Sequence, residues 1–375
     1  MDVKQFVTEN ISSLYELLAR IAPIPAPSHK EDERAAFVLS WLREQGAEDA
    51  YIDSAKNVVY PIGCEGSNEI SVICAHTDTV FPDLEPLPYS DDGEIIKCPG
   101  IGDDTASLVV LLFAAKYFIE ANIKPRGGII FLANSCEEGL GNLKGTRKLF
   151  EDYSGRIKKF ISFDSCISSI DDRCVGSTRY EVTVRTEGGH SYQSFGNSNA
   201  IAELSRIVGK IYEIEPPKKE GFRATYNVGE ISGGTSVNTI AESARMLCEY
   251  RSDNYEFLQV MKEKFYSIFD SVKREGVEVE VKCVGDRPCE KGVSRDEVNT
   301  LVKLASDIIR DVTGEAPKTK SASTDCNIPL SLGIPAICIG VYRGGGAHKR
   351  EEWIEKSSLV PGLEIGIRTA LELVK

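Results

Sequence analysis

The chain has 375 residues, 42% of them hydrophobic and 27% charged, which is the composition of a folded globular protein and excludes a disordered or fibrous one. Its formal charge is −13, which argues against nucleic acid or an anionic membrane surface as the main partner, because both require clustered Lys and Arg. The longest apolar run, residues 108–115, is far shorter than the roughly 20 residues that cross a bilayer. The length predicts two domains or one domain with an insertion.

The cysteines and the N-terminus predict a cytoplasmic protein. The eleven cysteines are odd in number, never form a Cys-x-x-Cys pair and lie mostly in apolar runs, as Cys74 and Cys338 do. Reduced, buried thiols are the better interpretation than a disulfide framework or a zinc knuckle. The N-terminus, which begins Met1-Asp2-Val3-Lys4, is mixed in charge, where a secretion signal needs a basic start and an unbroken apolar stretch.

The first part of the chain alternates helix and strand patterns. An amphipathic helix is predicted over 3–21, and Ser28 with Glu31 is spaced as a capping box for a second helix that ends near Gly46. Apolar strands are predicted over 70–75, 129–133 and 160–163, and the clearest helix between them covers 107–121. Such alternation is typical of a mostly parallel, buried sheet in an α/β domain.

From about residue 175 the order of elements changes to β-α-β-β-α-β, which is typical of a ferredoxin-like α+β unit. The α/β pattern resumes after Pro288, with a helix over 296–312, a strand over 336–341 and a last helix from Ser358. We therefore predict one α/β domain, residues 1–175 and 288–375, interrupted by a smaller α+β domain, residues 176–287. The predicted elements of the smaller domain are strand 180–185, helix 199–214, strands 225–231 and 244–250, helix 255–273 and strand 277–281.

Chemistry-bearing residues follow the predicted strands of the larger domain. His76 and Asp78 come directly after the first apolar strand, and Asp78 is placed to hold the far ring nitrogen of His76. Asp103 and Asp104 follow a pair of glycines, and one of them alone would be a helix cap. Taken singly, a surface turn or a cap is the better interpretation of each motif.

Three more signals fall at comparable places. Glu137 and Glu138 follow the second strand, Asp164 follows the third, and His348 comes after a glycine-rich stretch beyond the last strand. Two neighbouring Glu residues can divide metal binding and proton transfer between them, although a solvated acidic loop is common in so acidic a chain. Together, two His and three carboxylates form a mixed N/O set suited to Zn²⁺, Co²⁺ or Mn²⁺, and they suffice for two ions that share a carboxylate.

With these motifs the sequence resembles the co-catalytic di-zinc metallopeptidases, the family of peptidase T, carboxypeptidases, aminoacylases and succinyl-diaminopimelate desuccinylase. The likeness covers nearly the whole chain and is nearest to peptidase T. The motifs that carry it are Ala75-His76-Thr77-Asp78-Thr79-Val80, Gly102-Asp103-Asp104, Glu137-Glu138-Gly139, Phe163-Asp164, Gly188-Gly189-His190-Ser191, Asn238, Arg251 and His348 with Glu352.

The resemblance implies a role for each residue of the metal site. Asp103 would bridge two divalent metals, most simply zinc with cobalt or manganese as alternatives. His76 and Asp164 would complete one site, Glu138 and His348 the other. Glu137 would be the general base that takes a proton from a metal-bridging water. The family also has an inserted lid domain that forms homodimers, and His190 on it would donate a hydrogen bond to the oxyanion in the partner subunit's site.

Other residues have two interpretations. Asn238 and Arg251 resemble substrate-holding residues, but Arg251 could equally form a structural ion pair. Gly345, within the glycines 344–346, would present backbone N–H groups to a substrate carboxylate, or belong to a flexible loop.

Asp at 164 is typical of the aminopeptidase and dipeptidase members, whereas carboxypeptidases and deacylases tend to have Glu. Residues 323–327 also look like the Ser-Asp-Ala-Asn stretch of peptidase T relatives. One motif departs from the pattern, because Thr105 stands where the family usually has Lys.

The sequence therefore predicts a cytoplasmic, dimeric di-zinc aminopeptidase of short peptides. A deacylase of N-acyl amino acids or a carboxypeptidase on the same metals is the first alternative. A catalytically silent metal- or peptide-binding relative is the second, and the presence of Glu137 beside all five predicted ligands argues against it.

Overall fold

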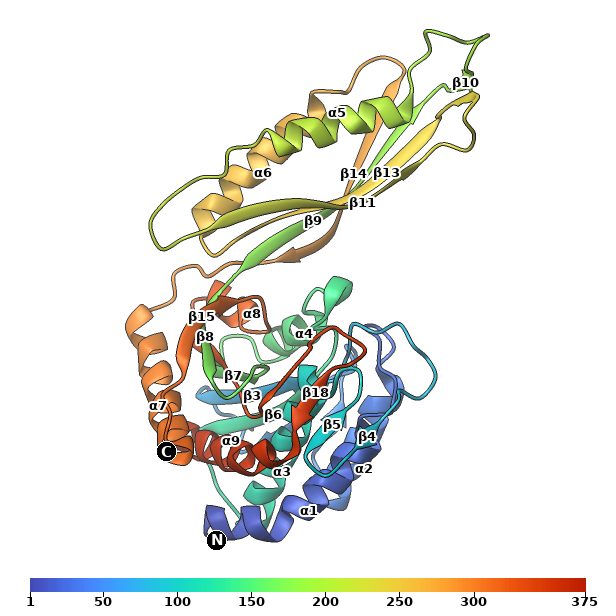
Figure 1. Ribbon diagram of the computed structural model, residues 1–375. Helices are drawn as coiled ribbons and strands as arrows, with labels where there is room; N and C mark the ends of the chain where they lie inside the picture. Colours follow the sequence, from blue (N-terminus) through green and yellow to red (C-terminus); the bar gives the residue numbers. More distant parts are fainter. The chain divides into compact units, whose positions relative to one another are not determined.

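The computed structural model describes residues 1–375 and divides them into two compact units (Figure 1). Unit 1 consists of Met1–Cys174 and Lys291–Lys375, and unit 2 consists of Val175–Glu290. The sequence of unit 2 therefore interrupts that of unit 1.

Unit 1 is built on an eight-stranded sheet with the order β1-β2-β6-β3-β7-β16-β8-β15. Its four central strands are parallel, and every residue of β6 (Gly128–Asn134) and β3 (Ile70–His76) is buried. Such continuous apolar runs form strands that are covered on both faces. The predicted mostly parallel sheet is confirmed. The other strands are β7 (Ile157–Phe163), β16 (Ala336–Ile339), β1 (Tyr51–Ile52), β2 (Val58–Ile62), β8 (Ser169–Cys174) and β15 (Lys318–Ala322).

Helices cover this sheet, and a small second sheet accompanies it. Helix α3 (Ser107–Glu120) packs on β3 and β6, and α7 (Arg295–Thr313) packs on β16 and β8. Helix α9 (Leu359–Leu373) contacts α1, α3 and α7. No helix of the chain combines the length and the apolar character that crossing a bilayer requires. The remaining helices are α1 (Val3–Ile21), α2 (Asp32–Glu44), α4 (Lys144–Asp152) and α8 (Asn327–Ser331), and the small sheet contains β4 (Ser90–Asp91), β5 (Ile95–Lys97), β17 (Gly344–Gly345) and β18 (Trp353–Glu355).

Unit 2 is an antiparallel sheet with two helices. The strand order is β11-β13-β9-β14, and helices α5 (Ala200–Tyr212) and α6 (Tyr255–Asp270) contact each other and the strands β9 and β13. Buried positions alternate along β13, as in a sheet covered on one face. The chain order β-α-β-β-α-β is the predicted ferredoxin-like one. The strands are β9 (Gly176–Thr186), β11 (Ala224–Gly233), β13 (Ser243–Ser252) and β14 (Val277–Arg287), with a separate ribbon of β10 (Gly189–His190) and β12 (Thr239–Ile240).

The predicted capping box at the start of α2 is wrong, because no side chain caps this helix. Ser28 instead donates through Oγ to Asp78 Oδ2 at 2.6 Å. Glu31 Oε1 accepts hydrogen bonds from the backbone N–H groups of His29 at 2.9 Å and Cys136 at 3.1 Å. Both side chains thus form hydrogen bonds with the loops that follow strands β3 and β6.

Candidate metal centre

Three parallel strands of unit 1 end at one edge of the sheet, and polar side chains follow each of them. His76 is the last residue of β3, Glu137 and Glu138 follow β6, and Asp164 follows β7. Because β3 pairs in parallel with both β6 and β7, the carboxyl ends of the three strands meet. This is the edge at which ligands bind in open α/β sheets.

Asp103 lies between two histidines that come from distant parts of the sequence. The segment Ile101–Ala106, whose backbone is not helical at Asp103, carries this residue and leads into α3. His76 Nε2 lies 2.9 Å from Asp103 Oδ1, and His348 Nε2 lies 3.1 Å from Asp103 Oδ2. A carboxylate that presents each oxygen to a different imidazole could bridge two metal ions, which is the role predicted for Asp103.

The two adjacent glutamates reach the same centre. Ligand atoms of His76, Glu137 and Asp164 lie within 4.8 Å of one another, and so do those of His76, Asp103 and Glu138. Both glutamates are buried, with 4% of Glu137 and 5% of Glu138 exposed. The structure therefore brings the predicted base into one cluster with the predicted ligands.

Asp78 supports this cluster from behind. Its Oδ1 accepts a hydrogen bond from the backbone N–H of Glu137 at 2.9 Å, and its Oδ2 accepts one from that of Glu138 at 3.0 Å. His76 Nδ1 lies 3.5 Å from Asp78 Oδ1 and 3.0 Å from the Asp78 carbonyl oxygen. Because acceptors face Nδ1, the ring proton lies on Nδ1. The free electron pair is then on Nε2, which faces Asp103.

Burial and crowding of negative charge shape the titration of the centre. Burial, together with the charges of Asp103 and Glu137, raises the pKa of Glu138 to about 7, against a hydrogen bond from His348. Burial and the charge of Asp103 raise the pKa of Asp164 well above its usual range. Hydrogen bonds to Asp103 and Glu138 raise the pKa of His348 to about 10. Divalent cations would relieve this repulsion.

The donor atoms fit a divalent metal. Glu138 Oε1 is buried, with His348 Nε2 3.3 Å away and no further hydrogen-bond partner in the protein. Imidazole nitrogens with carboxylate oxygens suit Zn²⁺, Co²⁺ and Mn²⁺. The division of the ligands into one set of His76, Asp103 and Asp164 and a second set of Asp103, Glu138 and His348 stays a prediction.

Glu352 fixes the loop that carries Asp103. Its carboxylate accepts hydrogen bonds from the backbone N–H groups of Gly100 at 2.8 Å, Gly102 at 2.9 Å and Asp103 at 2.7 Å. The sequence predicted no role for it beyond its place four residues after His348. Since both residues lie on the link between β17 and β18, Glu352 ties the loop of one ligand to that of another.

Asp325 holds the loop of the two glutamates, a role that the sequence did not predict either. Its carboxylate accepts hydrogen bonds from Asn134 Nδ2 at 2.6 Å and from Thr146 Oγ1. Asn134 precedes Glu137 and Glu138, and Thr146 follows them. Its sequence signal is the likeness of residues 323–327 to the Ser-Asp-Ala-Asn stretch of peptidase T relatives.

His190 and Asn238 lie in unit 2. His190 is exposed on β10, and its Nδ1 accepts hydrogen bonds from the backbone N–H groups of Tyr192 at 3.3 Å and Gln193 at 3.4 Å. The ring proton is thereby assigned to Nε2, which can donate it outward. The Asn238 carbonyl accepts from the backbone N–H of Ser191 at 3.0 Å, so the two predicted residues lie on neighbouring segments.

Arg251 and Gly345 are held by local structure. Arg251 forms two hydrogen bonds with the carboxylate of Glu249, from Nε at 2.7 Å and from Nη2 at 3.0 Å. This is the ion pair that the sequence left open as an alternative. Gly345 belongs to unit 1, in β17 opposite Trp353 of β18.

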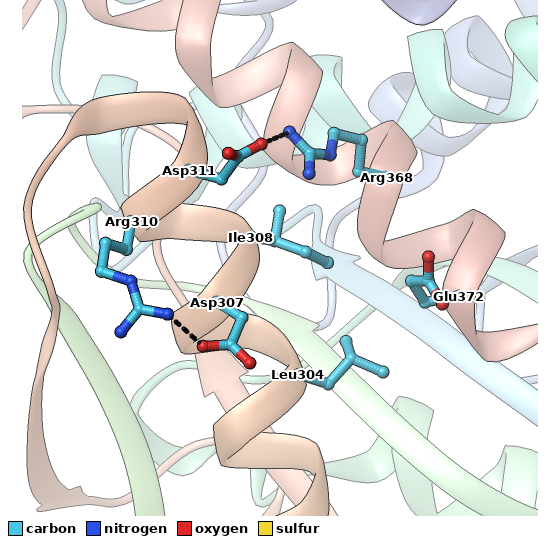
Figure 2. A pocket seen from close by; sticks show the side chains of 7 residues that line it. All are labelled: Leu304, Asp307, Ile308, Arg310, Asp311, Arg368 and Glu372. Atoms are coloured by element: carbon cyan, nitrogen blue, oxygen red, sulfur yellow. Dashed lines mark hydrogen bonds and ion pairs between the residues drawn. The ribbon is translucent and has the colours of Figure 1, made fainter.

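Unit 1 also has a hollow of about 710 Å³ between α7 and α9, shown in Figure 2. Two ion pairs occupy its wall, Arg368 with Asp311 at 2.7 Å and Arg310 with Asp307 at 2.5 Å. None of the metal-site residues lines it. Because these charges satisfy one another, we assign it no ligand.

The strand-end ligand set and its adjacent buried carboxylate define a metal-dependent hydrolase that acts on amide bonds. The chain belongs to the peptidase family M20/M25/M40, whose model matches residues 72–372. This range includes every predicted ligand, from His76 to His348. The family predicted from the sequence motifs is therefore confirmed.

Individual relatives match most of the chain. Succinyl-diaminopimelate desuccinylase of Corynebacterium glutamicum is 25% identical over 349 residues, which cover 90% of this chain and 90% of the relative. The structure of aminopeptidase PepT from Bacillus cereus matches with a TM-score of 0.75 and 21% identity over 98% of this chain and 99% of that one. A dinuclear metal binding peptidase of Bacillus subtilis matches with a TM-score of 0.66 and 16% identity over 98% and 99%. These structures share the fold.

Proposed function

We propose that the protein is a zinc-dependent exopeptidase that cleaves short peptides from their N-terminal end. The observation that carries the proposal is Asp164 at the centre beside His76 and Glu137, since Asp at this place is typical of the aminopeptidase and dipeptidase members. Similarity in fold to an aminopeptidase of Bacillus cereus supports it.

The chemistry follows from the positions of the side chains. When bound, the two metal ions supply Lewis acidity that activates a water molecule and polarises the scissile carbonyl. Glu137 takes a proton from the attacking water and returns it to the leaving amine, so that the carbon–nitrogen bond breaks as the carboxyl group forms. Asp78 keeps the backbone of Glu137 in place during both transfers.

A second candidate uses the same centre on a different amide. Similarity over 90% of the chain to a desuccinylase favours removal of an acyl group from an N-acyl amino acid. The two reactions share Glu137 and the metal ligands and differ only in what the site accepts around the scissile bond. A carboxypeptidase is a variant of this second candidate.

We infer that two subunits associate through unit 2 and that His190 donates from Nε2 to the oxyanion formed in the partner subunit. Asn238 and Arg251 would contact the substrate from unit 2, and Gly345 from unit 1. The pairing of Arg251 with Glu249 means that a substrate carboxylate would have to compete with an existing partner. The cytoplasmic location remains a prediction from the sequence.

The test is hydrolysis of di- and tripeptides against N-acetyl and N-succinyl amino acids, with protein loaded with zinc or cobalt. We expect two metal ions per chain, cleavage of peptides with a free amino group, and loss of activity with a chelator. N-terminally blocked tripeptides are the matched control and should be poor substrates. Preferred cleavage of N-acyl amino acids would replace the peptidase by the deacylase, and activity that survives removal of all metal would overturn both.

A further inference from the structure

Arg34 on helix α2 is the largest fully buried side chain of the protein. Its guanidinium donates hydrogen bonds to the carbonyl oxygens of Ile24 at 3.1 Å, Thr77 at 3.0 Å and Ala22 at 3.4 Å, and to Thr105 Oγ1 at 3.4 Å. A buried charge is costly unless its surroundings compensate it, and an apolar residue would fill the same space at less cost. The presence of a cation here therefore calls for a physical reason.

Two of these contacts lead to the metal centre. Thr77 lies between His76 and Asp78, and Thr105 lies two residues after Asp103. Nη1 of Arg34 donates to both threonines, so one guanidinium nitrogen joins the end of strand β3 to the turn that carries the bridging carboxylate. The hydroxyl of Thr105 in turn donates to the carbonyl of Gly100 at 2.6 Å, within the same loop.

The charge of Arg34 persists at neutral pH. Burial lowers its pKa to about 10, while Cys98 and Asp78 act in the opposite direction. The guanidinium is thus a fixed positive charge behind a centre that contains several buried carboxylates. Its planar fork suits carbonyl oxygens that come from different segments.

We propose that Arg34 is a positioning residue of the metal centre, a buried cation on helix α2 that holds the backbone beside His76 and the turn that carries Asp103. It reaches that turn through the hydroxyl of Thr105. The inference rests on the proposed metal-dependent function. It assigns to Arg34 the orientation of His76 through Thr77 and of Asp103 through the turn.

The first experiment compares Arg34→Leu with Arg43→Leu. Arg43 lies on the same helix and donates only to the Ala50 carbonyl, at 3.0 Å, so it is the matched control. Zinc affinity is measured by competition with a chelator, the cobalt-loaded protein is examined by its visible absorption, and Tm is measured without metal. We expect Arg34→Leu to lose about 10- to 100-fold in zinc affinity, the usual effect of removing a partner that orients ligands, and to change the cobalt spectrum. Arg43→Leu should change neither.

The second experiment removes the positive charge at position 34 and introduces one at position 105. The double variant Arg34→Leu with Thr105→Lys should recover most of the zinc affinity and the cobalt spectrum, because the ammonium group takes the place of the guanidinium. If Arg34→Leu fails to fold, the double variant carries the test, and its folding with near wild-type zinc affinity supports the proposal. A double variant that also fails to fold, or that binds zinc as weakly as Arg34→Leu, would overturn it.

Two further outcomes are decisive. Unchanged zinc affinity with a lowered Tm in Arg34→Leu would show a purely structural role, and tighter zinc binding would show that only repulsion between charges matters. Either result overturns the positioning role. Failure of the proposed function is separate, because wild-type protein would then bind no stoichiometric zinc or bind it without hydrolysing amides.

Discussion

Asp78 Oδ1 accepts the backbone N–H of Glu137 at 2.9 Å, so the residue behind the metal centre also holds the chain that carries the proposed base. The same oxygen lies 3.5 Å from His76 Nδ1. Burial raises the pKa of Asp78, but hydrogen bonds from His76 and Ser28 outweigh burial and keep this pKa below its usual range. One carboxylate thus sets the orientation of a metal ligand and of the base together.

Replacement of Asp78 by Ala should weaken metal binding and catalysis at once. Loss of the carboxylate frees the backbone of Glu137 and Glu138 and removes the negative charge 3.5 Å from His76 Nδ1, and we expect zinc affinity to fall about 10- to 100-fold. Chelator competition measures the affinity. Asp311→Ala, which removes only a surface ion pair with Arg368, is the control and should bind zinc as the wild type does. Equal affinities in the two variants would refute the role of Asp78.

Substitution by Gln should have different effects at Glu137 and Glu138, on catalysis at the first and on metal binding at the second. Glu137→Gln should retain both metals and the fold while kcat falls roughly 10²- to 10⁴-fold, the usual contribution of positioned acid–base catalysis. Glu138→Gln should instead weaken one of the two metal sites, because it removes a charged ligand. Metal titration beside steady-state kinetics separates these outcomes. If Glu137→Gln lost a metal while Glu138→Gln kept both, the two assignments would be exchanged.

Zinc binding should release protons, and the number released per zinc ion should be larger at pH 6 than at pH 8. Metal ligands bind in their deprotonated form, and in the metal-free protein the pKa of Glu138 is about 7 and that of His348 about 10. The bound form therefore carries fewer protons, and a rise in pH favours binding. Calorimetry in buffers of different ionisation enthalpy should show that about one proton fewer is released at pH 8 than at pH 6.

Glu138 contributes to this step in proton release. Glu138→Gln has no carboxyl group to titrate and serves as the control, in which the difference between the two pH values should become smaller; Asp164, whose pKa is also raised, accounts for what remains. A wild-type protein that releases the same number of protons at both pH values would contradict the raised pKa of Glu138.

His190 should complement a defective base across the dimer. His190→Ala and Glu137→Gln, each inactive alone, are unfolded and refolded together so that subunits mix at random. Half of the dimers are then mixed and half of the sites in these are intact, so activity should recover to roughly a quarter of wild type under two-fold symmetry. Background activity, with subunit exchange verified by a mass tag, would show that His190 serves its own chain or that the protein is a monomer.

The central part of the fold could be predicted because its signal is local. Strands β3 and β6 are buried along their whole length and β7 over its last four residues, and the ends of these strands locate His76, Glu137 and Asp164 without any knowledge of distance. The edge strand β15 could not be predicted, since four of its five residues are exposed and two are lysines. It becomes a strand by pairing with β8, which is a contact between distant segments.

Arg34 shows the same limit within the site. A charged residue on an amphipathic helix is ordinarily assigned to the solvent face. It is buried here because its hydrogen-bond acceptors come from Ile24, Thr77 and Thr105, which the fold brings together from separate parts of the chain. No pattern within α2 contains this information.

The interruption of unit 1 by unit 2 has a consequence for biosynthesis. Residues up to Cys174 contain His76, Asp103, Glu138 and Asp164, whereas His348 follows only after all of unit 2 has been translated. Under the predicted division of ligands, the first segment therefore holds one full set and an incomplete second set. The second metal position cannot be completed before the segment that carries His348 is synthesised, so we expect full metal loading to follow synthesis of that segment.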